Sequence, residues 1–353
     1  MVDVEKEVKI LHIDTGLSWR GGQRQALILH LGLLKNNIES VIVCNQNGEL
    51  YKKCIENNVS KCIGFNYKRT LFPNKKEIDN ILKLDNFSII HCHDSGSASI
   101  GQKFVSKYIL FHTRRVSYPI NFLSRLFKYN KFSAHVCVSE DIRKYMTKFF
   151  KNCHTIHSCV ELNRFNKRLN HKVFRKKGEL NFLFVGAFTK QKGIEVVIEA
   201  FSKVLQDFPR LALHLVGHGE LFSKVTQLTE RLGMSDNVCF YGTRNDVEQF
   251  YQETDFVIVP SSNGEGSSGV IKEGMAAGKV IIASNLEANK ELVDHMVNGL
   301  LFETDNSESL SNLMKEVIIN KQLINSLEIN KKIKEFDCQK NIESYIKLYK
   351  RYA

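Results

Sequence analysis

Several features that identify particular classes of protein are scarce or missing in this chain of 353 residues. It contains no run of about 18 or more apolar residues, so the sequence predicts no membrane-spanning helix. Its first seven residues, Met1-Val-Asp-Val-Glu-Lys-Glu, are too charged for a signal peptide. Nine cysteines are scattered with no C-x-x-C pair, which argues against a disulfide framework and favours reduced, mostly buried thiols. Together these absences predict a cytoplasmic protein.

Negative charge is also scarce, but only in the first half of the chain. The net charge is +12; residues 1–168 carry 27 Lys and Arg against 14 Asp and Glu, whereas residues 169–353 carry 23 against 24. A positive field confined to one half attracts anionic partners such as a phospholipid surface, a diphospho-lipid, a phosphorylated glycolipid or nucleic acid. The remaining composition, 43% hydrophobic and 25% charged, is ordinary for a globular protein, and the length predicts two domains.

Short apolar strands alternate with helical patterns along both halves. In the first half the expected strands are 8–14, 41–44, 88–92, 108–112 and 134–138, with a helix over 25–34. The pattern restarts with strands over 182–185, 211–216, 256–259 and 280–283 and a helix over 194–205. This alternation is typical of a doubly wound parallel α/β sheet. We therefore predict an α/β protein with Rossmann-like domains at 1–168 and 169–335, a polar and basic linker at 163–178 and a final helix at 336–353.

Two carboxylates eight positions apart lie in the loop and helix that follow the strand 256–259. The stretch reads Pro260-Ser-Ser-Asn-Gly-Glu265-Gly-Ser-Ser-Gly-Val-Ile-Lys-Glu273-Gly-Met-Ala-Ala-Gly278, and it predicts a helix from near Gly266 to near Gly278. Backbone N–H groups and the helix dipole at such a start favour a phosphate. Glu273 is expected about two helical turns beyond Glu265, on roughly the same face. One carboxylate can then meet a sugar and the other a ribose.

This stretch resembles the E-x7-E signature of glycosyltransferase family 4, which comprises retaining nucleotide-sugar enzymes with the GT-B fold. Other landmarks of the family follow in its order over most of the chain: Trp19-Arg-Gly-Gly-Gln-Arg24, Phe184-Val-Gly-Ala-Phe-Thr-Lys-Gln-Lys-Gly193, Leu213-His-Leu-Val-Gly-His-Gly219, Val238-Cys-Phe-Tyr-Gly242 and Asn298-Gly-Leu-Leu301. The resemblance implies two Rossmann-like domains facing a central cleft. It also implies that the first domain binds the acceptor, that the second binds the donor, and that the last helix crosses back to the first domain.

The resemblance further implies roles for individual residues. Glu265, His112 and Lys192 are expected at the reaction centre, with Arg114 as the alternative to His112 at the same strand end. The implied donor-binding set is Gly21, Gly22, Gly186, Lys192, Gly217, Glu265, Gly266, Ser267, Ser268, Gly269 and Glu273. The implied acceptor-binding set is Arg24, His93, Asp94, Arg114 and Arg115. The resemblance implies no metal, and the sequence contains no D-x-D motif. It implies no cofactor either, only a nucleotide-sugar co-substrate carrying UDP, GDP or ADP.

Some positions depart from the family pattern or suit a simpler role. The family usually carries an arginine where this chain has Ala187, so Lys190 or Arg24 would have to compensate, or the phosphate is held differently. The run His91-Cys-His-Asp94 has residue types that bind zinc, yet no second cluster supplies further ligands at a recognisable spacing. Because side chains alternate along a strand, its two histidines are expected on one face, with His93 or Asp94 at the strand end near the acceptor.

The stretch 118–131 carries aromatics, leucines and cations at four-residue spacing. Basic amphipathic helices of this kind lie on anionic bilayers, although a core-packing helix with a cationic edge has the same pattern. We therefore expect a protein peripheral on the inner face of the cytoplasmic membrane, transferring sugar to a hydroxyl of a lipid-linked or acidic glycan in bacterial lipopolysaccharide or capsule synthesis. The alternatives are a soluble acceptor on the same fold and a catalytically inactive scaffold. No nucleic-acid-binding motif supports a nucleic-acid partner.

Overall fold

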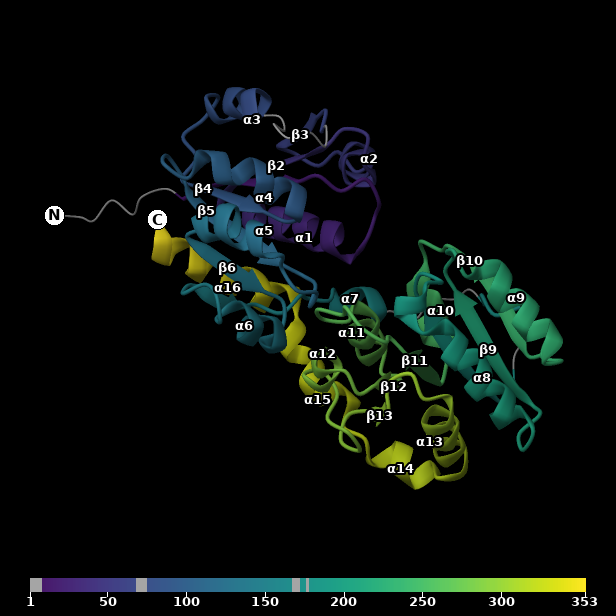
Figure 1. Ribbon diagram of the computed structural model, residues 1–353. Coiled ribbons are helices and arrows are strands. Elements are labelled where there is room, and N and C mark those ends of the chain that lie inside the picture. Colours follow the sequence, from purple (N-terminus) through teal and green to yellow (C-terminus); the bar gives the residue numbers. More distant parts are fainter. Residues whose placement is uncertain (1–7, 68–74, 167–171, 176–177) are drawn as a thin grey trace. The chain divides into compact units, whose positions relative to one another are not determined.

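The computed structural model describes residues 8–67, 75–166, 172–175 and 178–353, and the chain divides into two compact units (Figure 1). Unit 1 comprises Met1–Ser158 and Cys338–Ala353, and unit 2 comprises Cys159–Asp337. Each unit is built on one parallel sheet. Within the described ranges, no helix combines the length and apolar character needed to cross a bilayer.

Unit 1 contains a seven-stranded sheet in the order β3-β2-β1-β4-β5-β6-β7, with parallel pairings throughout. Its strands are β1 (Lys9–Asp14), β2 (Glu39–Asn45), β3 (Cys62–Phe65), β4 (Ile89–Cys92), β5 (Ile109–Arg114), β6 (Ala134–Cys137) and β7 (Cys153–Thr155). Its helices are α1 (Gly21–Lys35), α2 (Glu49–Glu56), α3 (Lys75–Leu82), α4 (Ser95–Gly101), η1 (Gln102–Phe104), α5 (Phe122–Phe127), η2 (Tyr129–Lys131), α6 (Glu140–Met146) and α16 (Cys338–Tyr352). The strand order reverses between β1 and β4, and parallel sheets bind ligands beside the carboxyl ends of strands at such a reversal.

Both faces of this sheet are covered, as expected for buried parallel strands. On one face Ile10 packs in a cluster with Leu33 of α1 and Tyr349 of α16. On the other face Ile13 packs in a cluster with Ala98 of α4. The alternation of side chains along β1 therefore places helices from both ends of the chain on one side of the sheet.

Unit 2 contains a six-stranded parallel sheet in the order β10-β9-β8-β11-β12-β13. Its strands are β8 (Leu180–Val185), β9 (Leu211–Val216), β10 (Val238–Gly242), β11 (Phe256–Val259), β12 (Val280–Ser284) and β13 (Leu300–Phe302). Its helices are α7 (Leu162–Phe165), η3 (Lys190–Lys192), α8 (Ile194–Leu205), α9 (Phe222–Arg231), α10 (Val247–Glu253), α11 (Gly269–Ala276), α12 (Glu287–Lys290), α13 (Ser307–Ile319), α14 (Lys321–Ser326), α15 (Ile329–Ile333) and η4 (Lys334–Phe336). Here the order reverses between β8 and β11.

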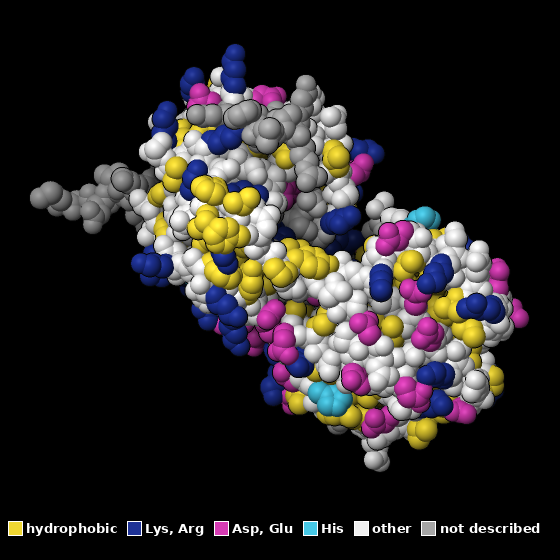
Figure 2. Space-filling view, in the orientation of Figure 1, with side chains coloured by type: hydrophobic (Ala, Val, Ile, Leu, Met, Phe, Trp, Pro, Cys, Tyr) yellow, Lys and Arg dark blue, Asp and Glu magenta, His cyan; other side chains and the backbone are white. Residues whose placement is uncertain are grey.

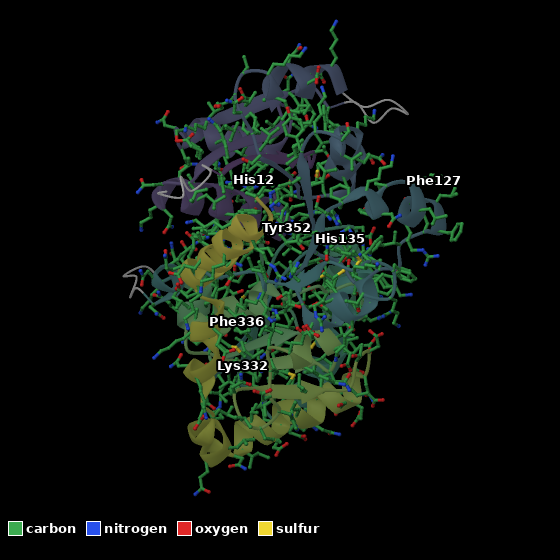
Figure 3. The ribbon with its side chains drawn as sticks, turned by 90° about the vertical axis from the view of Figure 1, so that its left-hand side faces the viewer. His12, Phe127, His135, Lys332, Phe336 and Tyr352 are labelled. Carbon is green, nitrogen blue, oxygen red and sulfur yellow. The ribbon has the colours of Figure 1, made fainter. Side chains whose placement is uncertain are left out.

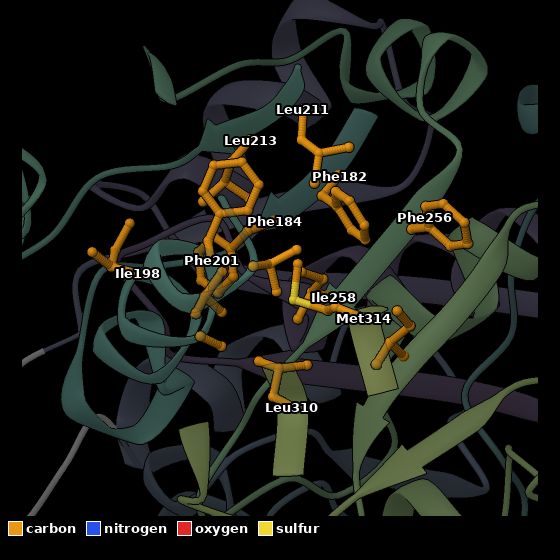
Figure 4. Close-up of a cluster of buried hydrophobic side chains, with 14 of the residues drawn as sticks. Phe182, Phe184, Ile198, Phe201, Leu211, Leu213, Phe256, Ile258, Leu310 and Met314 are labelled. Atoms are coloured by element: carbon orange, nitrogen blue, oxygen red, sulfur yellow. The ribbon is translucent and has the colours of Figure 1, made fainter. Parts of the chain in front are cut away.

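The core of unit 2 also forms two layers, one on each face of the sheet. In the layer of Figure 4, Phe182 of β8 stacks on Phe256 of β11 with ring centroids 4.9 Å apart, and Phe201 of α8 packs beside them. Leu183, the neighbour of Phe182, points to the opposite face and packs with Ile271 of α11. The strand β8 thus anchors α8 on one side and α11 on the other.

The boundary between the units lies earlier than the sequence predicts. The expected first domain ended at residue 168, but α7 packs in unit 2, where the rings of Phe165 and Tyr251 lie 5.6 Å apart. The predicted linker, 163–178, therefore begins inside unit 2; its residues 167–171 and 176–177 lie outside the described ranges. The chain leaves unit 2 after Asp337, and the Val160 N–H donates to the Phe336 carbonyl at 2.9 Å beside this second crossing.

Candidate active site

The loop between β11 and α11 carries the first of the two predicted carboxylates. Helix α11 begins at Gly269, three residues later than predicted, because Ser268 caps it and its Oγ accepts from the Ile271 N–H at 3.4 Å. Glu265 and Gly266 consequently lie in the loop, and only Glu273 is helical. The sequence predicted that the two carboxylates would lie on roughly the same helical face. In the structure they instead flank the start of α11.

Glu265 is held by a cation from a distant part of the sequence. The Lys192 ammonium group forms an ion pair with the Glu265 carboxylate, and Ser261 Oγ donates to Glu265 Oε1 at 2.8 Å. The Ser262 N–H also donates to the Gln191 carbonyl at 2.9 Å, which fastens the two loops together. The structure therefore brings two predicted reaction-centre residues into direct contact.

Glu273 is oriented by a residue that the sequence analysis did not identify. Tyr251 of α10 is fully buried, and its hydroxyl donates to Glu273 Oε2 at 2.9 Å. A charge-assisted hydrogen bond of this kind fixes the direction of the carboxylate. No local sequence pattern marks Tyr251, because the contact depends on how α10 packs against α11.

Two predicted glycines lie where strands β8 and β9 end. The Gly186 N–H donates to the Val216 carbonyl at 2.9 Å, one step beyond the regular pairing of the strands. Gly217 has φ +141°, and a Cβ atom there would overlap the Gly186 carbonyl oxygen. Ala187 follows these contacts, and Lys190 lies on the same short helix, η3, as Lys192. The ends of β8 and β9, beside Lys192, therefore carry glycines, which have no side chain.

In unit 1 a helix start and a cation lie together. Helix α1 begins at Gly21 with no side-chain cap and no acidic residue in its first turn, which also contains Arg24. Arg115 lies against Gly22, where an added Cβ would be 3.4 Å from Arg115 Cδ. Arg115 also donates to the carbonyl oxygen and to Nδ1 of His93, at 3.0 and 3.1 Å. A bare helix N-terminus beside a guanidinium group suits an anion.

Hydrogen bonds fix the proton positions on the two histidines nearest Arg115. Because Arg115 donates to His93 Nδ1, the proton of His93 is on Nε2, which lies 2.9 Å from His12 Nδ1 and donates to it. His12 then carries its proton on Nε2. Burial lowers the pKa values of both rings well below 6.5, so both are neutral. His93 therefore positions Arg115, and its place near the acceptor stays a prediction.

His91 shares the strand face of His93, and their ring centroids are 4.3 Å apart, as strand alternation predicts. Its Nδ1 bonds to the Tyr349 hydroxyl and its Nε2 to Thr113 Oγ1, both at 2.6 Å. Since both ring nitrogens of His91 and of His93 are engaged in hydrogen bonds, this histidine cluster forms a buried network.

Asp94 has a structural role at the same sheet edge. Its carboxylate accepts from the Thr15 and Ser97 N–H groups, each at 2.6 Å, so it caps α4 and ties that helix to the loop after β1. The predicted acceptor contact would have to compete with these bonds. The nearby Asp14 was missed: burial and the Asp94 carboxylate raise its pKa to about 6.

His112 and Arg114, the candidates for the reaction centre in unit 1, are both buried. The His112 ring is 3% exposed and lies 4.7 Å from the Tyr129 ring and 5.7 Å from the Phe132 ring. Burial lowers its pKa well below 6.5 and keeps it neutral. Arg114 is 7% exposed and donates to the Tyr118 carbonyl. Arg115, the neighbour of Arg114, contacts Gly22 of the glycine loop, and the roles of His112 and Arg114 at the reaction centre stay predictions.

Both halves of the chain match families of known proteins. Residues 19–164 match the family model "Glycosyltransferase Family 4", and residues 166–335 match "Glycosyl transferases group 1". An uncharacterized glycosyltransferase of Methanocaldococcus jannaschii is 28% identical over 318 residues, covering 86% of each chain. An uncharacterized 41.2 kDa protein in the cps region of Klebsiella pneumoniae is 23% identical over 354 residues, covering 90% of this chain and 93% of the relative.

A solved structure has the same fold. HepE of Anabaena, crystallised with UDP-glucose, superposes with a TM-score of 0.78 at 18% identity, covering 96% of this chain and 99% of HepE. The two family matches, the pair of parallel sheets and this likeness agree with one another. The chain therefore belongs to the glycosyltransferases of the GT-B fold, with a family 4 domain followed by a group 1 domain.

Proposed function

We propose that this glycosyltransferase is a retaining, metal-independent enzyme that uses a nucleotide sugar, carrying UDP, GDP or ADP, and a lipid-linked or acidic glycan acceptor. The observation that carries the proposal is the placement of Glu265 and Glu273 on either side of the α11 start. Lys192 and Ser261 hold Glu265, and Tyr251 holds Glu273. The UDP-glucose bound by HepE supports the donor class. The cps-region relative supports a role in capsule or lipopolysaccharide synthesis.

The residues of unit 2 suit the donor. The N–H groups of Ser267, Ser268 and Gly269 at the start of α11 would hold the diphosphate. Lys192 would exchange its Glu265 partner for phosphate oxygens, which frees the Glu265 carboxylate for hydroxyls of the sugar. Glu273, directed by Tyr251, would accept hydrogen bonds from the ribose hydroxyls.

The reaction is a same-face substitution. The acceptor hydroxyl oxygen forms a bond to the anomeric carbon, the bond from that carbon to the diphosphate breaks, and the departing diphosphate takes the hydroxyl proton. Lys192 and the start of α11 stabilise the charge left on the diphosphate. Alignment of the two substrates supplies the rest of the acceleration.

The acceptor side of the proposal rests on the surface of unit 1. Helix α5 points its apolar residues outward: Phe122, Leu123, Leu126 and Phe127 are 60%, 65%, 45% and 65% exposed. Figure 3 labels Phe127 on this helix, and Figure 2 shows hydrophobic side chains gathered on unit 1 among Lys and Arg. The predicted alternative, a core-packing helix, does not fit these exposures.

Exposed cations complete that surface. Lys131 follows α5, and Lys144, Lys148 and Lys151 lie on or just after α6. Arg125 of α5 stacks over the ring of the exposed Phe149, 4.1 Å from its centroid, which joins α5 to the segment after α6. Apolar side chains surrounded by lysines suit an anionic bilayer, so we place the acceptor on the inner face of the cytoplasmic membrane.

A panel of nucleotide sugars tests the donor. Purified protein is screened by saturation-transfer NMR, with Glu273→Ala beside it and Lys203→Ala, which breaks an exposed ion pair with Glu308, as the control. We expect one nucleotide sugar to bind wild type and the control but not Glu273→Ala. Binding to none of the three would favour the inactive scaffold, and turnover with a soluble sugar in place of a lipid-linked one would favour the soluble acceptor.

A further inference from the structure

A lysine lies fully buried in α11, directly before Glu273. Lys272 has 0% exposure and ranks among the largest wholly buried side chains described. Lysine is rarely buried to this degree without a specific partner, because removing an ammonium group from water is costly. Neither the sequence motif nor the proposed mechanism assigns it a role.

Lys272 contacts the loop before α11 and the last segment of unit 2. Side chains in a helix lean toward its N-terminus, and Lys272 Nζ reaches back to donate to Ser267 Oγ at 2.6 Å. On its other side Nζ lies 5.2 Å from the centroid of the Phe336 ring. Lys272 thus connects the loop before α11 to the segment where the chain leaves unit 2.

Apart from burial, the neighbouring groups with the largest effect on the pKa of Lys272 all favour its protonated form. These groups are the Cys159 thiol and the carboxylates of Glu265, Glu273 and Glu291. Burial nevertheless outweighs them and lowers the pKa of Lys272 to about 7. In the absence of ligand, the side chain is therefore poised between its charged and neutral forms near neutral pH.

We propose that Lys272 is a positioning residue for the donor: it holds the Ser267 hydroxyl beneath the start of α11 and takes up a proton when a diphosphate occupies that loop. This inference rests on the proposed function. A bound sugar diphosphate brings two negative charges to the loop, and nearby negative charge favours the ammonium form. The proton comes from solvent and binds Lys272 Nζ, so the positive charge at this site increases when the donor binds.

Calorimetry in buffers of different ionisation enthalpy measures this proton directly. The probe is UDP-glucose, or the nucleotide sugar selected by the panel above; neither has a diphosphate group that titrates near pH 7. Wild type is expected to take up about half a proton on binding at pH 7, because a group with a pKa of about 7 is half protonated there. Uptake should fall toward zero at pH 5.5, where Lys272 is already charged.

Two substitutions separate the linked proton from the fold. Lys272→Arg keeps a permanent charge and should bind the donor within about threefold of wild type, with no proton uptake. Lys272→Met keeps the length of the side chain and should bind at least about tenfold more weakly, also without uptake. Lys279→Met is the control, because Lys279 Nζ donates to the Gln252 carbonyl instead; it should behave as wild type.

The outcomes separate this inference from the proposed function. Donor binding without proton uptake by wild type, or with uptake that persists in Lys272→Met, overturns the role of Lys272 and leaves the proposed function intact. Failure of wild type to bind any nucleotide sugar overturns both. If Lys272→Met does not fold, Lys272→Arg still decides the question, since loss of uptake with retained affinity is expected only if Lys272 supplies the proton site.

Discussion

The outward apolar face of α5 predicts a measurable affinity for anionic membranes. Complete burial of a Phe side chain contributes about 1.5–3 kcal/mol. Because Phe122 and Phe127 are 60% and 65% exposed, transfer of their exposed parts into a bilayer should contribute about 1–2 kcal/mol each. Replacing both with Ser should then weaken vesicle binding by about 30-fold or more, since 1.4 kcal/mol is a factor of ten.

The assay is co-sedimentation with vesicles that contain or lack phosphatidylglycerol. Wild type should bind the anionic vesicles and bind more weakly as salt is raised, because the surrounding lysines contribute about 1 kcal/mol each near a charged surface. The matched control is Ile319→Ser, which removes an apolar side chain of 72% exposure from α13 in unit 2. It should bind as wild type does.

Two results would refute the reasoning. If wild type does not sediment with anionic vesicles, the exposed face of α5 is not a membrane contact. If the Phe122→Ser/Phe127→Ser variant binds as tightly as wild type while the salt dependence remains, the lysines act alone and the apolar side chains contribute nothing.

Three further predictions concern single residues. Tyr251→Phe removes the hydrogen bond to Glu273, worth about 1.5–3 kcal/mol with a charged acceptor, so the melting temperature should fall by a few degrees and donor titration should show weaker binding, because Glu273 is no longer fixed in direction; unchanged affinity would contradict it. Gly217→Ala, at φ +141°, should lower the melting temperature by several degrees, because the strain costs about 1–3 kcal/mol before the overlap with Gly186; Gly233→Ala, also at positive φ but with no neighbouring atom within 4 Å, is the milder control. The raised pKa of Asp14, about 6, means that the folded state favours the neutral acid, so its stabilising contribution is present below pH 4 and is lost as pH rises through 6; denaturant titrations at pH 4 and pH 7 should show the free energy of unfolding shifting in favour of Asp14→Asn by about 2–3 kcal/mol, and parallel values would refute the shift.

The regular elements were predictable where the signal is local. Residues 194–205, 211–216 and 256–259 have the predicted bounds for α8, β9 and β11, because each is a long or strongly apolar run with its own periodicity. The strands β3 and β7 were not predicted: they have four and three residues and stand at or near the edge of the sheet. Such short, partly exposed segments carry too few apolar positions to show a pattern.

Only the candidate-site residues that belong to the family's sequence motifs could be predicted. Glu265, Lys192 and Glu273 follow from the resemblance, and the structure gives them partners. Tyr251 and Lys272 escaped notice because their importance lies in contacts between elements, and a lysine inside a helix normally indicates a solvated face. The burial of His112 was not predictable for the same reason, since the strand end is visible in the sequence but the aromatic residues that cover it come from η2 and the segment beside it.

Helix α16 gives the chain an order of assembly. Residues 159–337 leave the ribosome before α16, so unit 2 can complete its core while unit 1 still lacks the helix that covers Ile10, Leu33 and Phe111. During that interval the His91 ring also lacks the Tyr349 hydroxyl that it bonds in the finished fold. A premature stop before Cys338 would therefore leave unit 2 intact but leave the apolar residues under α16 in unit 1 exposed to solvent. Chaperones and proteases recognise such exposed apolar surface.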